Sequence, residues 1–150
     1  MSPLRLAGLP LHPALIHFPI AFWALAPLGD TAFWMTDEPI WWFWGRLAAA
    51  AAAITAIPAM IAGALDLLAL GDTPWSDLGW RHAGWMGTTW TVSALGLLVG
   101  GFSKGPHAVA IAVTVLDVLA LACLVIGAHR GGQLVYVHGV GTRTGKQTAL

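Results

Sequence analysis

Histidines are the residues of this sequence with the most chemistry to offer, because a neutral imidazole is the commonest metal ligand in proteins. The 150 residues include six of them. His12 and His17 stand in the stretch LHPALIHFPI, which opens a long apolar run. Ionisable side chains in such a run are rare and point to a functional site. His17 is therefore the first candidate for a metal-binding or haem-binding residue.

The composition predicts an integral membrane protein. Hydrophobic residues make up 57% of the chain and charged residues only 9%, whereas soluble domains carry about 25% charged residues. The formal net charge is zero, so the chain has no basic face with which to bind nucleic acid. The first apolar run has no convincing signal-peptide cleavage site, and we expect it to be retained.

Four apolar segments are long enough to cross a bilayer, which takes about 20 residues per helix. Residues rich in turn and capping signals separate them. The sequence therefore predicts a single all-α domain over residues 1–150, an integral membrane four-helix bundle with both termini on the same side. The predicted helices span about 13–35, 41–70, 78–102 and 107–128, and a tail follows over 129–150. The pair Gly131-Gly132 is predicted to be a turn or a helix stop.

The distribution of basic residues predicts the orientation. We call the side of the membrane that holds both termini the terminal side. It collects Arg5, Arg81, Arg130, Arg143 and Lys146, and the opposite side collects Arg46 and Lys104. The positive-inside rule then places the termini in the cytoplasm. Tryptophans are expected in two belts at the lipid headgroups: Trp34, Trp41, Trp42 and Trp44 on the opposite side, and Trp75, Trp80 and Trp85 on the terminal side.

The predicted topology also sorts the histidines. Five of the six fall on the terminal side, namely His12, His17, His82, His129 and His138, whereas His107 is expected at the opposite boundary beside a turn. A b-type haem in a helix bundle needs two axial histidines on different helices. His17 and His82 lie at similar depth in their predicted helices and are our predicted ligands of a haem iron, with His129 as a third candidate. The alternative is that these imidazoles cap helix ends and bind loop carbonyls, and we favour that role for His12 and His138.

Acidic and basic residues inside the predicted helices also need an explanation. Asp66 is predicted to pair with Arg81 or to orient His82, as residues surrounding metal ligands often do; His12 and His138 are further candidates for this surrounding shell. Asp30 and Arg46 lie at matched depth from the opposite side and predict a structural ion pair.

Asp117 is close to the middle of the fourth predicted helix, where a charged carboxylate costs about 2.5–3.5 kcal/mol. We expect a neutral carboxyl group that hydrogen-bonds a threonine (Thr88, Thr89 or Thr91) or a backbone carbonyl of a neighbouring helix. A role in proton handling or in a polar quinone site is the alternative.

Several motifs together resemble a known family. They are His12-Pro13 and His17-Phe18-Pro19 at the first predicted helix, Asp66 late in the second, His82 at the start of the third, and GGQLVYVHGVG over Gly131–Gly141. The chain is similar in these to the bacterial "domain of unknown function 2231" family of predicted membrane proteins. Related domains occur joined to Rieske iron–sulfur or cytochrome c modules. The resemblance thus implies a bacterial inner-membrane location and membrane electron transfer.

These observations predict a membrane electron-transfer subunit that binds b-type haem, or contacts quinone, at a histidine cluster on the terminal side. No nucleophile elbow, zinc-protease or phosphate-loop motif occurs, and we expect no independent catalytic activity. Expected partners are the bilayer and a membrane or redox protein, with homo-oligomer formation as a further option. Two alternatives stay open: a structural or assembly subunit of a larger membrane complex, and a metal-ion or proton-handling membrane protein.

Overall fold

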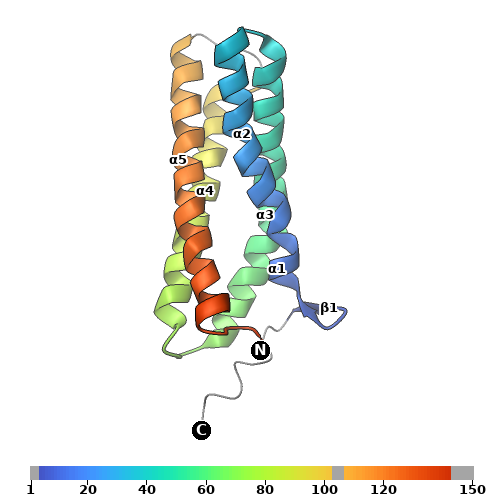
Figure 1. Cartoon of the computed structure of the whole chain (residues 1–150), viewed down its shortest axis with the longest axis vertical. Helices are drawn as coiled ribbons and strands as arrows, with labels where there is room; N and C mark the ends of the chain where they lie inside the picture. Colours follow the sequence, from blue (N-terminus) through green and yellow to red (C-terminus); the bar gives the residue numbers. More distant parts are fainter. Residues whose placement is uncertain (1–3, 103–106, 143–150) are drawn as a thin grey trace.

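A computed structural model describes residues 4–102 and 107–142, which form one long bundle of helices (Figure 1). A small hairpin of β1 (Arg5–Leu6) and β2 (Leu9–Pro10) leads into the short helix α1 (Leu11–Leu15). The long helices are α2 (His17–Thr36), α3 (Pro39–Leu70), α4 (Ser76–Gly100) and α5 (His107–Gly132), and a π-helical turn η1 (Gln133–Val137) follows. Strand β1 and the end of α5 lie at the same end of the bundle (Figure 1).

The bundle consists of two helical hairpins. Helix α2 packs mainly against α3, and α4 packs mainly against α5. Small residues bring the helix backbones of the first hairpin close together: a Cβ atom added at Gly29 of α2 would lie 2.6 Å from the Cα atom of Gly45 in α3. Ala52 and Ala56 of α3 are fully buried beside Trp23 and Leu124, in the core where the two hairpins meet.

The apolar side chains of the bundle also point outward, as in a membrane protein. Leu28, Ile54, Leu98 and Val125 are each more than 60% exposed, although they are large hydrophobic residues on four different helices. Within the described residues, three helical stretches are long and apolar enough to cross a membrane, namely Leu11–Thr36, Pro39–Leu70 and His107–Val137. The all-helical fold of four long helices, three of them strongly apolar, is that of a membrane protein.

Two helix boundaries differ from those predicted by the sequence. The first predicted helix is divided at Ile16 into α1 and α2. Pro19 explains the break, because it has no N–H group to donate to the carbonyl oxygen four residues earlier. The fourth helix continues through Gly131-Gly132 to η1, so this glycine pair is not a helix stop. Residues 143–150 of the predicted tail, and Lys104, Arg143 and Lys146 with them, lie outside the described residues.

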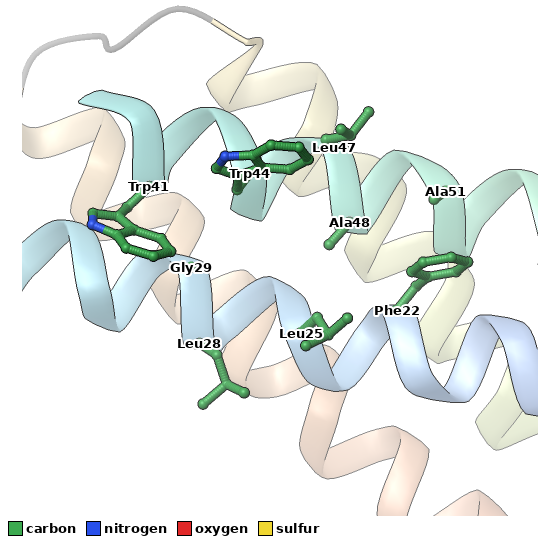
Figure 2. Close-up of a pocket in the computed structure, with 9 residues that line it drawn as sticks. All are labelled: Phe22, Leu25, Leu28, Gly29, Trp41, Trp44, Leu47, Ala48 and Ala51. Atoms are coloured by element: carbon green, nitrogen blue, oxygen red, sulfur yellow. The ribbon is translucent and has the colours of Figure 1, made fainter. Parts of the chain in front are cut away.

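The outer face of the α2–α3 hairpin carries an apolar groove of about 360 Å³. Figure 2 shows the rings of Trp41, Trp44 and Phe22 around the small residues of its floor. Its lining residues are Phe22, Leu25, Leu28, Gly29, Trp41, Trp44, Leu47, Ala48 and Ala51. None of these side chains is charged, so the groove suits a hydrocarbon chain. Trp42, which the sequence placed in the same tryptophan belt, is instead 1% exposed and packs in the core.

Candidate functional site

His12 is the second residue of α1 and reaches across to α3. Its Nδ1 atom lies 2.8 Å from the carbonyl oxygen of Ala59, and the side chain is half-buried. A carbonyl oxygen only accepts hydrogen bonds, so Nδ1 of His12 carries the proton and donates. The lone pair of a neutral His12 is then on Nε2, where it is available to a ligand.

His82 in α4 has the same arrangement with α5. Its Nδ1 atom donates to the carbonyl oxygen of Gly127 at 2.8 Å, which again leaves the lone pair on Nε2. A backbone carbonyl that holds Nδ1–H is a usual way in which proteins fix the tautomer and ring orientation of a metal-binding histidine. The sequence predicted that Asp66 pairs with Arg81 or orients His82; the partner of Nδ1 of His82 in the structure is the Gly127 carbonyl.

Each imidazole also lies over a glycine, one helical turn beyond the carbonyl to which it donates. A Cβ atom at Gly63 of α3 would lie 2.8 Å from Cε1 and Nδ1 of His12, and a Cβ at Gly131 of α5 would lie 2.8 Å from Cε1 of His82. Real Cβ atoms do not approach other atoms so closely. The absence of a side chain at both glycines therefore gives each imidazole its access to the helix backbone.

The two imidazoles are close to each other. The ring centroids of His12 and His82 are 6.3 Å apart, and the ring planes are inclined by 79°. Two imidazoles that bind opposite sides of one metal ion at a metal–nitrogen distance of about 2.0 Å have centroids about 6.3 Å apart. The pair thus has the spacing of two trans ligands to a single metal.

The number of protein ligands limits the kind of metal centre. Among residues 4–102 and 107–142, no group of three or more histidine, cysteine, aspartate or glutamate side chains is placed to hold a metal ion. Protein zinc sites take three or four such ligands. Within the part of the chain described, the pair His12–His82 suits a metal whose other ligands come from elsewhere.

The other predicted ligands lie apart from this pair. The side chains of His17 and His129 are exposed, and Nδ1 of His17 is 3.4 Å from the carbonyl oxygen of Ala14. His12 and His17 stand on opposite sides of the break at Ile16. His12 is the one that faces the neighbouring hairpin, where it lies beside His82, whereas the side chain of His17 is exposed.

Two further histidines that the sequence singled out pack against tryptophan rings. His138 stacks on Trp75, with ring centroids 3.8 Å apart, and Arg81 is exposed whereas Asp66 is half-buried. His107 lies beside Trp34 with ring centroids 6.0 Å apart, at the start of α5.

A second polar centre lies inside the bundle. The Nη2 atom of Arg46 in α3 is 2.5 Å from Oδ1 of Asp30 in α2 and also contacts Oδ2 of Asp117 in α5. All three side chains are at most 3% exposed. The predicted partners Asp30 and Arg46 are thus in contact, but the expected bond from Asp117 to a threonine was wrong, because Arg46 is long enough to reach both carboxyl groups.

The spacing of residues in the sequence could have pointed to the pair His12–His82, although the sequence analysis predicted His17 and His82 instead. His12 and the residue that accepts its hydrogen bond are 47 positions apart, and His82 and its acceptor are 45 apart. In both cases a glycine follows the acceptor by four residues. The two hairpins therefore repeat one arrangement of histidine, carbonyl and glycine, which the dissimilar residues around it conceal.

The comparisons agree with this class of membrane helical bundle. The sequence profile of the domain of unknown function 2231 (DUF2231) family, described as a predicted membrane protein, matches residues 8–144. The chain belongs to this family. Neither the search of curated proteins nor that of solved structures found a match.

Proposed function

We propose that this protein is a membrane electron-transfer subunit that binds one b-type haem between His12 and His82. The observation that carries the proposal is the pair of imidazoles 6.3 Å apart. Each comes from a different hairpin, and each is fixed by a hydrogen bond from Nδ1 to a backbone carbonyl. This proposal keeps His82 from the sequence-based prediction and replaces His17 with His12.

The donor set favours haem over a bare metal ion. A porphyrin would supply four nitrogen ligands to its iron, so the protein would need to contribute only two. His12 and His82 would supply this number. A zinc or copper ion at the same place would lack the third protein ligand that such sites use, within the residues that the structure describes.

The haem would supply one-electron redox chemistry, and the protein residues would position it. The carbonyls of Ala59 and Gly127 hold the two imidazoles as ligands, while Gly63 and Gly131 leave room for their rings. Since the ligands come from both hairpins, haem binding would also fasten the hairpins together. A quinone or a partner redox protein would exchange the electron.

We further propose that all four long helices cross the bacterial inner membrane, with the histidine pair on the cytoplasmic side. Helix α4 has 25 residues, enough for about 37 Å of helix. Arg46, counted above as a charge on the opposite side, is fully buried and belongs to the bundle interior. Removing it from the count strengthens the positive-inside bias toward the terminal side.

The test is a reduced-minus-oxidised visible spectrum of protein purified from cells supplied with iron and haem precursor. We expect the α-band of a bis-histidine haem in the wild type and its loss in His12→Ala and His82→Ala. The variants His17→Ala in α2 and His129→Ala in α5 remove exposed histidines near the same end of the chain's helices and serve as controls that keep the band. Absence of the band in the wild type, or its persistence in His12→Ala and His82→Ala, would contradict the proposal and leave the assembly-subunit alternative.

A further inference from the structure

The centre formed by Asp30, Arg46 and Asp117 is separate from the proposed haem site. Arg46 and Ala59 are thirteen residues apart on α3, which corresponds to about 20 Å along a helix. Asp117 and Gly127 on α5 are separated by about 15 Å in the same way. The histidine pair and the triad therefore lie in different halves of the bundle.

The charges of this triad do not balance. One guanidinium faces two carboxyl groups, which leaves a net charge of −1 if all three side chains are ionised. Arg46 and Asp30 are 0% exposed and Asp117 is 3% exposed, and these are the charged side chains among the buried residues of the described chain. Helix α4, which also packs here, contributes the uncharged residues Thr89 and Ser93 to the buried set. An uncompensated charge in such surroundings is strongly unfavourable.

The two carboxyl groups are also neighbours on one guanidinium nitrogen. Both contact Nη2 of Arg46, Asp30 through Oδ1 and Asp117 through Oδ2. Two ionised carboxylates can only accept hydrogen bonds, whereas a protonated carboxyl group can donate one to an ionised neighbour. Two negative charges on neighbouring buried carboxyl groups repel each other, and this repulsion favours the state in which one of the two groups is neutral.

Several buried polar atoms around the triad have no hydrogen-bond partner among the described residues of the protein. Nε and Nη1 of Arg46 and Oδ2 of Asp30 are buried without a hydrogen-bond partner, and so are Nε1 of Trp42 and Oγ of Ser93. The guanidinium lies over the Trp42 ring, 4.8 Å from its centroid. Ser93 precedes Gly96 by three residues on one face of α4, and Gly96 is the glycine beside Oδ1 of Asp117. Buried groups of this kind are normally satisfied by internal water.

We propose that the triad of Asp30, Arg46 and Asp117 is a proton-binding site within the membrane. One proton is shared by Asp30 and Asp117 and brings the net charge of the triad to zero. Water bonded to Arg46, Trp42 and Ser93 carries this proton to and from the site. The proposal is independent of haem, since it rests on residues in the other half of the bundle.

The site is tested by infrared spectroscopy of the purified protein at neutral pH in H₂O and D₂O. The wild type is expected to show the carbonyl stretch of one protonated carboxylic acid, with a shift on deuteration. Asp30→Asn and Asp117→Asn should both lose the band, because the remaining carboxylate forms a one-to-one ion pair with Arg46. The control Asp72→Asn, at an exposed position, keeps it.

A further variant keeps the test decisive if an asparagine variant does not fold. In Arg46→Gln no cation remains opposite the carboxyl groups, so both become protonated and the band doubles in area. A wild type without the band would overturn the proposal and point to a bound metal cation as the neutralising charge. A band that persists in both asparagine variants, or stays the same in Arg46→Gln, would overturn it too.

Discussion

The imidazole rings of His12 and His82 stand 6.3 Å apart with their planes inclined by 79°, although 70 positions separate the two residues in the chain. Each ring is held by one carbonyl and one glycine of another helix, α3 for His12 and α5 for His82. This repeated support distinguishes the pair from histidines that only cap a helix end. The histidines and the glycines can each be replaced singly, so the contribution of each to the site can be measured.

Exchange of one proposed axial ligand should change the redox potential without removing the haem. In His12→Met, the thioether sulfur would replace an imidazole on one side of the iron, and methionine–histidine ligation raises the potential. We expect an increase on the order of 0.1 V, within the roughly 0.8 V that axial ligands span. Spectroelectrochemical titration measures it. His17→Met serves as the control with an unchanged potential, and an equal shift in both variants would rule out His12 as a ligand.

Filling the space beneath either imidazole should weaken haem binding. In Gly63→Ala and Gly131→Ala the new methyl group would lie 2.8 Å from a ring atom of His12 or His82, so the ring must leave its carbonyl partner. Loss of such orienting contacts typically costs 10–100-fold in affinity, by analogy with other metal sites. Haem titration of the apoprotein gives this ratio.

A matched control for these glycine variants is Gly87→Ala in α4. A Cβ atom there meets nothing within 4 Å, and alanine is the better helix former by about 1 kcal/mol. This variant should bind haem as the wild type does. If Gly63→Ala and Gly131→Ala also bind haem with wild-type affinity, then the glycines do not support the site.

The sequence alone predicted the class of fold because the signals for it are local. Apolar segments of sufficient length and the turn residues between them define four helices, and the structure contains these helices. Matched depth from the membrane boundary was also enough to bring Asp30 and Arg46 together. The depth of a residue in the membrane depends only on its distance along the helix from the membrane boundary, and the limits of the apolar segments predict that distance well.

The arrangement around the helix axis was harder to predict. His12 and His17 are both at the start of the first apolar run, and depth alone favoured His17. The break at Ile16 and the rotation between the two residues decide which imidazole faces the second hairpin, and both depend on packing. For the same reason Asp117 was assigned a threonine partner, since the reach of Arg46 across the bundle is not visible in a helix-by-helix interpretation.

The stack of His138 on Trp75 predicts a local role for His138. The rings are 3.8 Å apart and nearly parallel, with an angle of 17°, and they join the end of η1 to the start of α4. His138→Ala should remove a contact worth about 0.5–1.5 kcal/mol and speed amide hydrogen exchange in η1. Mass spectrometry of deuterated peptides measures this rate. The haem spectrum should stay the same; a changed spectrum would instead make His138 part of the haem surroundings.

The close contact of Gly29 with Gly45 predicts the most damaging small substitution in the first hairpin. In Gly29→Ala the new methyl group would lie 2.6 Å from the Cα atom of Gly45. Because that atom belongs to the backbone, α2 and α3 must separate, and overpacking of this kind costs about 1–3 kcal/mol. Thermal unfolding in detergent should show the loss, whereas Gly87→Ala stays at or above the wild-type stability. Separation of these helices would also move Asp30 on α2 away from Arg46 on α3, so the infrared band of the protonated carboxyl group should change in Gly29→Ala. Wild-type stability together with an unchanged band would mean that α2 and α3 do not pack through these two glycines.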